Sequence, residues 1–67
     1  MWTIKRVQTE RPQVRVNVGG KVLDGMIVGT RLEHPSVRVG HGAVSQSFEY
    51  AWETILRALD DGLTLQT

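Results

Sequence analysis

The chain has 67 residues, of which 40% are hydrophobic and 22% charged, and it contains no cysteine. This composition is typical of a folded chain, and it excludes disulfides and thiolate metal sites. A chain of this length is expected to form one domain, residues 1–67, with a small core, because it buries only about 60% of its unfolded surface. No apolar run reaches the roughly 20 residues of a membrane span or resembles a signal peptide, so we expect a cytoplasmic protein.

The net charge of +1 conceals an uneven distribution of charged residues along the chain. The first 21 residues carry one carboxylate, Glu10, and the cations Lys5, Arg6, Arg11, Arg15 and Lys21. The last 19 residues carry one cation, Arg57, and the carboxylates Glu49, Glu53, Asp60 and Asp61. The sequence therefore predicts a basic start and an acidic end.

Alternating apolar residues predict the first two strands. Trp2 and Ile4 alternate with polar residues, which favours a strand over residues 2–9 that ends before Pro12. The segment Gln13–Val18 has the cleanest alternation in the chain. The pair Gly19–Gly20 follows it and predicts a tight hairpin, because primed turns need positive φ angles.

The next predicted strand covers residues 21–32 and is interrupted by Gly25 and Gly29. Glycine inside a strand indicates a bulge or a bend towards barrel closure. The alternative is a turn at Asp24–Gly25 that divides the segment into two short strands. Turns are expected at residues 33–35 and 40–42, with strands at 36–39 and 43–50.

One amphipathic helix is predicted over residues 48–62, where apolar residues recur every three or four positions and Gly62 provides the stop. Phe48 fits both this period and the alternation of the preceding strand, so the boundary between the two elements stays open. Leu63 and Leu65 then predict a short edge strand over residues 63–66. The expected core consists of Val14, Val16, Val18, Ile27, Val37, Val39, Trp52, Ile55, Leu56 and Leu59.

These elements predict a mainly β, α+β fold. It would be a small barrel, or a curled antiparallel sheet of about five strands, with one C-terminal helix. Over most of residues 12–66 this pattern resembles SH3-like barrels. Such barrels serve many unrelated functions, so the resemblance implies a fold and not an activity.

No motif for catalysis or metal binding is present in the sequence. His34 and His41 are seven residues apart, beside proline and glycine, and are interpreted as turn residues. No serine lies in a nucleophile elbow, and the glycine pairs lack phosphate-loop spacing. Glu49 and Glu53 are interpreted as a solvated helix face. We therefore expect no metal, no cofactor and no enzymatic activity.

One segment nevertheless resembles an enzyme family. Residues 25–29, with the sequence GMIVG, are similar to a glycine-bounded segment of the type II dihydrofolate reductases, which are SH3-like barrels that form tetramers around a pore. This resemblance implies a tetrameric reductase. The family's pore-lining VQIY segment is replaced here by VSQSF at residues 44–48. An enzyme of this family is therefore the last of the hypotheses.

The leading hypothesis is a non-enzymatic binding module. If the first two strands are neighbours, Lys5, Arg6, Arg11, Arg15 and Lys21 form one basic face that binds nucleic acid through its phosphates. Trp2 and Tyr50 are the candidates for stacking on bases. Two alternatives stay open. In the first, the cations belong to an ordinary solvated strand face and bind no ligand. In the second, the chain is a protein-interaction or self-assembling accessory protein, such as one carried by a mobile element.

Self-association into a dimer is also expected. The core is small, no disulfide or metal supports it, and the charges at the two ends of the chain are opposite. A strand containing Leu63 and Leu65 at a sheet edge would leave backbone groups for a second chain. The alternative is that this strand closes the monomer's own barrel against the first strand.

Overall fold

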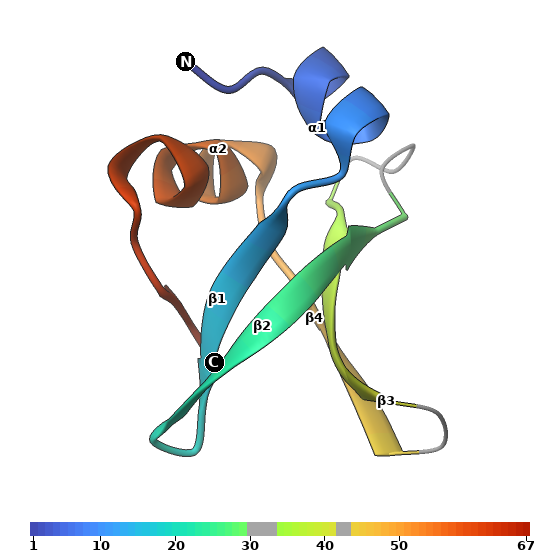
Figure 1. Ribbon diagram of the computed structural model, residues 1–67, viewed down its shortest axis with the longest axis vertical. Helices are drawn as coiled ribbons and strands as arrows, with labels where there is room; N and C mark the ends of the chain where they lie inside the picture. Colours follow the sequence, from blue (N-terminus) through green and yellow to red (C-terminus); the bar gives the residue numbers. More distant parts are fainter. Residues whose placement is uncertain (30–33, 42–43) are drawn as a thin grey trace.

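The computed structural model describes residues 1–29, 34–41 and 44–67 (Figure 1). Five strands form one curled sheet in the order β4-β3-β2-β1-β5, and both helices lie at the same end of it. The β1–β5 pairing is parallel and the other pairings are antiparallel, so the sheet is mixed. The mainly β, α+β class is confirmed. The elements in order are α1 (Ile4–Glu10), β1 (Gln13–Val18), β2 (Lys21–Val28), β3 (Ser36–His41), β4 (Val44–Glu49), α2 (Trp52–Asp61) and β5 (Leu65–Gln66).

The strand predicted over residues 2–9 is wrong, because this segment forms helix α1. The Thr3 hydroxyl caps the helix by accepting the backbone N–H of Arg6 at 3.1 Å. Arg6 and Glu10, one turn apart, form an ion pair of 2.7 Å. Val7 is completely buried and anchors the helix to the core.

The predicted hairpin of β1 and β2 is confirmed. Gly19 and Gly20 have φ angles of 60° and 85°, as a type I′ turn requires. The β1–β2 ladder continues without a break from Val18↔Lys21 to Gln13↔Met26. The bulge at Gly25 and the alternative turn at Asp24–Gly25 are therefore wrong, whereas the curl of the sheet (Figure 1) agrees with the other expectation, a bend towards closure. Gly25 is a glycine for another reason, since a Cβ atom there would collide with the Val37 side chain. The end of the predicted strand, residues 30–32, lies outside the described residues.

The strands β3 and β4 confirm the predictions at residues 36–39 and 43–50, with shifted ends. β3 extends through Gly40 to His41, so these two residues belong to the strand and not to the predicted turn at 40–42. Ala43, Gly42 and Glu33 lie outside the described residues. Helix α2 begins at Trp52 instead of residue 48, and Gly62, with a φ of 67°, ends it as predicted.

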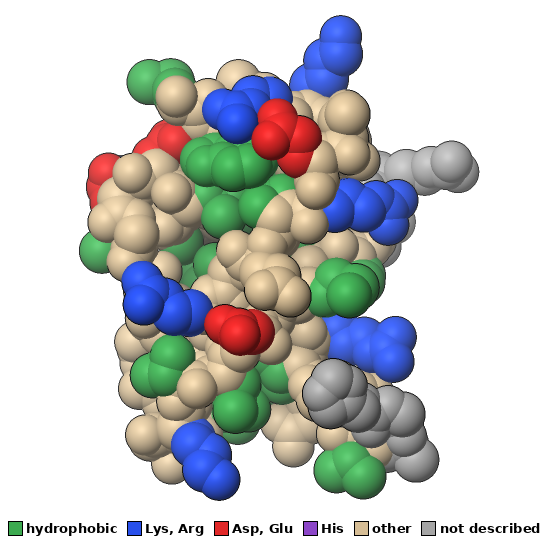
Figure 2. All heavy atoms as spheres, viewed as in Figure 1, with side chains coloured by type: hydrophobic (Ala, Val, Ile, Leu, Met, Phe, Trp, Pro, Cys, Tyr) green, Lys and Arg blue, Asp and Glu red, His purple; other side chains and the backbone are tan. Residues whose placement is uncertain are grey.

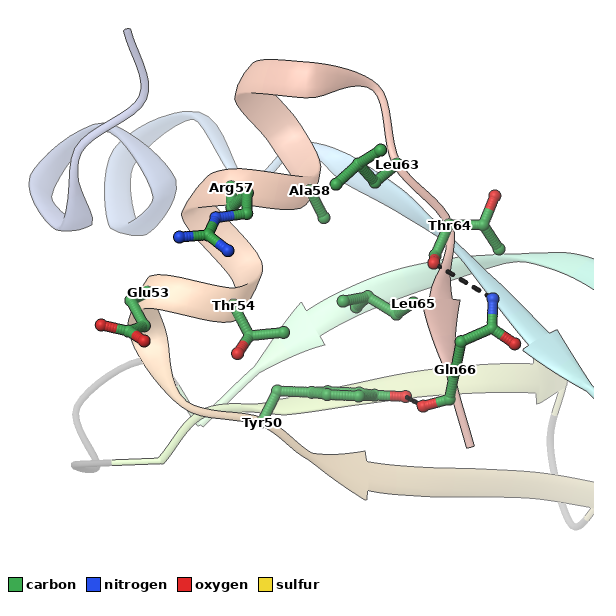
Figure 3. A pocket seen from close by; sticks show the side chains of 9 residues that line it. All are labelled: Tyr50, Glu53, Thr54, Arg57, Ala58, Leu63, Thr64, Leu65 and Gln66. Carbon is green, nitrogen blue, oxygen red and sulfur yellow. Dashed lines mark hydrogen bonds between the residues drawn. The ribbon is translucent and has the colours of Figure 1, made fainter.

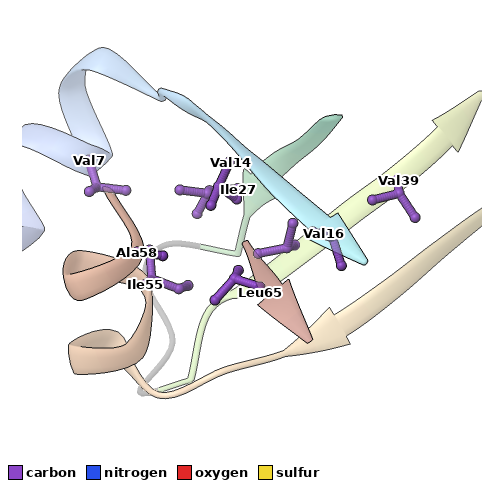
Figure 4. Close-up of a cluster of buried hydrophobic side chains, with 9 residues drawn as sticks. Val7, Val14, Val16, Ile27, Val39, Ile55, Ala58 and Leu65 are labelled. Atoms are coloured by element: carbon purple, nitrogen blue, oxygen red, sulfur yellow. The ribbon is translucent and has the colours of Figure 1, made fainter. Parts of the chain in front are cut away.

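The core lies between the curled sheet and the two helices (Figure 4). Six of the ten predicted core residues are buried, whereas Val18, Trp52, Leu56 and Leu59 are only half-buried around them. Trp52 is the first residue of α2, and the fully buried side of that helix consists of Ile55 and Ala58. Buried apolar residues that the sequence did not predict are Val7, Ala58 and Leu65.

The predicted C-terminal strand is present as β5, a two-residue strand at the sheet edge. It pairs with β1 through Val16↔Leu65 and Asn17↔Gln66, so it extends the chain's own sheet. The Tyr50 hydroxyl, just after β4, donates a hydrogen bond of 3.0 Å to the Gln66 carbonyl (Figure 3). This bond connects the two ends of the sheet and brings the curl close to closure.

Candidate binding surfaces

The predicted nucleic-acid-binding residues are all exposed, but the structure divides them between different elements. Lys5 and Arg6 lie in α1, Arg11 follows it, and Arg15 and Lys21 lie in β1 and β2. They therefore do not form one strand face, as the sequence predicted, because the first predicted strand is a helix.

The Arg6 side chain contacts two residues of its own chain, Trp2 and Glu10. Its guanidinium group lies 4.1 Å from the centroid of the Trp2 ring and pairs with Glu10. The hydrogen bond from Arg6 lowers the pKa of Glu10, and the same bond raises the pKa of Arg6. Both groups are therefore charged at neutral pH, and Arg6 contributes little free positive charge to the surface.

Arg15 also has a structural contact. Its Nη2 atom donates a hydrogen bond of 3.1 Å to the carbonyl of Gly62, the residue that ends α2. A cation is favourable at this position because the carbonyl end of a helix carries partial negative charge. Asp24 lies opposite Arg15 in the β1–β2 ladder and reduces the net charge there.

Six exposed cations form no ion pair with any carboxylate that the structure describes: Lys5, Arg11, Arg15, Lys21, Arg38 and Arg57. Arg57 lies on α2, and Arg15 bonds to the Gly62 carbonyl. Arg38 was not among the predicted site residues. It lies opposite Met26 on the convex face of the sheet, and Met26 is 56% exposed. The alternation of Arg38 with the buried Val37 and Val39 is the sequence signal that could have identified it. Figure 2 shows Lys and Arg side chains distributed over the face that presents β1 and β2.

The aromatic residues do not provide an exposed stacking surface. The chain's four aromatic residues, Trp2, Phe48, Tyr50 and Trp52, are all half-buried and pack against the core. Arg6 covers the Trp2 ring, and the Tyr50 hydroxyl is bonded to Gln66. Partial burial raises the pKa of Tyr50, so its hydroxyl remains a donor at neutral pH.

Two of the hollows in the described surface lie beside the side chains of Arg57 and Arg38. A groove of about 400 Å³ separates α2 from β5, with Ala58 and Leu65 on its apolar side and Glu53 and Arg57 on the helix (Figure 3). A wider hollow of about 580 Å³ lies where β2 and β3 diverge, beside Met26 and Arg38. The β2–β3 ladder ends at Gly25↔Val39, and Gly40 has a φ of 95° at the point of divergence.

The two histidines lie near the two ends of β3. His34 is exposed before β3, and His41 is the last residue of that strand. Within residues 1–29, 34–41 and 44–67, no group of three His, Cys, Asp or Glu residues is placed to hold a metal ion. In the same ranges, no helix has the length and apolarity needed to cross a membrane.

The segment that resembles type II dihydrofolate reductases covers the end of β2 and Gly29, where Ile27 is completely buried and Met26 is exposed. Comparison with protein-family models, curated proteins and solved structures finds no match to this chain.

Proposed function

We propose that this protein is a small, non-enzymatic binding module of the SH3-like barrel type that binds the phosphate backbone of nucleic acid. The fold assignment is supported by the strongly curled five-stranded sheet, in which β5 returns to β1. The absence of cysteine fits a cytoplasmic location, where thiols and not disulfides are the rule.

The observation that carries the proposal is the excess of cations over carboxylates on α1 to β3, where the described carboxylates are Glu10, paired with Arg6, and Asp24. Lys5, Arg11, Lys21 and Arg38 are exposed on or between α1 and β3, without a described carboxylate partner. The carboxylates Glu49, Glu53, Asp60 and Asp61 belong to the end of β4 and to α2. Exposed cations that need no internal partner are available to replace the counterions of a phosphate backbone.

The same surface favours backbone contacts over base recognition. Single-stranded nucleic acid is commonly held by aromatic side chains that stack on bases. All four aromatic side chains of this protein pack against the core instead. We therefore infer that the ligand is a duplex, which presents two phosphate strands and keeps its bases stacked, and that binding depends little on sequence.

Fluorescence anisotropy with a labelled duplex of about 20 base pairs at low salt tests this function. We expect binding at tens of micromolar protein or below, weakened similarly for all sequences by Arg38→Gln. Arg57→Gln is the matched control, because Arg57 is an equally exposed arginine among the carboxylates of α2. Equal losses for the two variants would contradict the proposed surface. Absence of binding to any duplex would contradict the function.

The second candidate is a protein-interaction or self-assembling module, such as an accessory protein of a mobile element. The observation that favours it is the six-residue strand β4 at one edge of the sheet, which carries no charge before Glu49.

A further inference from the structure

The two edges of the sheet are protected to very different degrees. At one edge, β5 has two residues, and the carbonyl groups of Gln66 and of the preceding residue Thr64 accept hydrogen bonds from side chains. Tyr50 donates its hydroxyl to the Gln66 carbonyl, and the Gln66 amide nitrogen lies 3.4 Å from the Thr64 carbonyl. Short strands and covered backbone groups are how proteins prevent pairing at an edge.

The opposite edge, β4, has none of these protections over most of its length. It is six residues long, and residues 44–48 contain no charge, proline or glycine. Val44 is 85% exposed, and no strand in the described part of the chain pairs with the outer side of β4. An edge of this composition is prone to pair with another strand.

The register of β4 shows which backbone groups are available. The backbone N–H of Tyr50 bonds to the Pro35 carbonyl, directly beyond the Ser36↔Glu49 pair. Because hydrogen-bonded pairs alternate along an antiparallel ladder, the even-numbered residues of β4 bond to β3. Ser45 and Ser47 therefore direct their backbone N–H and carbonyl groups towards the open side.

We propose that β4 pairs antiparallel with β4 of a second copy of this chain, about a twofold axis that passes between the two Gln46 residues. In this register Ser45 of each copy forms a hydrogen-bonded pair with Ser47 of the other. Val44 lies opposite Phe48 of the second copy, so two exposed or half-buried apolar side chains cover each other at each end. The result is a continuous sheet across the dimer.

The second copy is the favoured occupant because the edge is neutral and complementary to itself. A twofold axis brings identical residues together, and residues 44–48 introduce no like-charge repulsion when they meet. The contact is shorter than a standard interface, so we expect a dissociation constant of the order of 100 µM. The pairing of β4 does not depend on nucleic-acid binding, because it uses the backbone groups of Ser45 and Ser47 and requires no cation.

Light scattering of the wild-type protein provides the first test. We expect a mass that rises towards twice the monomer value as the protein concentration increases to about 500 µM. A monomer mass at that concentration overturns the proposal.

Cysteine cross-linking tests the position of the axis, and the chain's lack of cysteine makes single substitutions unambiguous. Two Gln46 residues on the axis form a non-hydrogen-bonded pair, whose Cα atoms are about 4.5 Å apart, within the disulfide range. Gln46→Cys is therefore expected to form a disulfide dimer under mild oxidation. The matched control, Gln66→Cys on β5, is expected to remain monomeric. Equal cross-linking of the two variants, or more for Gln66→Cys, overturns the proposal.

Charge substitution at the same position separates loss of pairing from loss of folding. Gln46→Lys alone and Gln46→Glu alone place like charges across the axis, so each variant is expected to be monomeric at about 500 µM. An equal mixture of the two is expected to form a heterodimer, because opposite charges then meet. A mixture that stays monomeric, or single variants that dimerise as the wild type does, overturns the proposal.

Discussion

The backbone N–H of Trp2 donates a hydrogen bond of 2.6 Å to the carboxylate of Asp60, so the start of the chain is attached to the last turn of α2. Arg6, which belongs to α1, covers the Trp2 ring and so holds the segment before α1 against α1 itself. Val7 lies towards Ala58 and Ile55 (Figure 4). The acidic end of the chain thus has a structural role in docking the basic start, and the cations outside this contact remain free for a ligand.

Docking of α1 can be measured with Val7→Ala. Val7 is completely buried, and removal of its two methyl groups should lower the free energy of unfolding by about 1.5–3 kcal/mol. Ile4→Ala in the same helix is the control, because Ile4 is 41% exposed and should matter much less. Equal losses in chemical denaturation would show that α1 is not docked through Val7.

The Arg6–Glu10 pair predicts a pH-dependent contribution to stability. Arg6 lowers the pKa of Glu10 in the folded state, so the stabilisation is present above the unfolded-state pKa and is lost as pH falls through the folded-state pKa. Glu10→Gln should therefore melt below the wild type at pH 7, and the difference should vanish in strong acid. A difference in melting temperature that is constant with pH would contradict this.

The bond from Tyr50 to Gln66 predicts the opposite pH dependence. Tyr50→Phe should cost about 0.5–1 kcal/mol at neutral pH, because one hydrogen bond is lost. Burial raises the pKa of Tyr50, so this stabilisation is present below the unfolded-state pKa and is lost as pH rises through the folded-state pKa. Urea denaturation of both proteins should converge above a pH of about 10. A gap that widens with pH would refute the assignment.

Local patterns predicted the elements that depend on local interactions. Gly19–Gly20 predicted the hairpin, because positive φ angles are a property of those two residues. Gly62 likewise predicted the end of α2. The alternation of Val14 and Val16 predicted the buried side of β1. The curled, mainly β sheet could therefore be predicted without tertiary information.

The wrong predictions of secondary structure fall where the sequence carries two patterns of similar strength that favour different structures. Trp2 and Ile4 alternate as a strand does, but the Thr3 cap and the spacing of Arg6 and Glu10 favour a helix. Both helical signals were readable in the sequence and were outweighed by a two-residue alternation. Gly25 was interpreted as a bulge or a bend from the local sequence alone. The structural reason for glycine at this position is the close approach of Val37, which depends on the pairing of β2 with β3.

Only part of the candidate site could be predicted from the sequence, because some of its contacts join residues that are distant in the sequence. The sequence identifies Arg15 as a cation, but its acceptor at Gly62 lies 47 residues away. Lys5, Arg11 and Lys21 were among the predicted residues and are exposed without a described ion-pair partner. Arg38 was omitted because the charges of its neighbourhood cancel in the sequence, whereas in the structure it lies beside Met26 on the convex face.

The salt dependence of duplex binding tests the central claim, that unpaired cations on α1 to β3 bind phosphates. The logarithm of the binding constant should fall linearly with the logarithm of salt concentration, with a slope of about −0.9 for each phosphate contact. The double variant Lys21→Gln/Arg38→Gln should make this slope shallower by about 1.8, whereas Arg57→Gln should leave it unchanged. A slope that is the same in the wild type and the double variant, or binding that is indifferent to salt, would contradict the account.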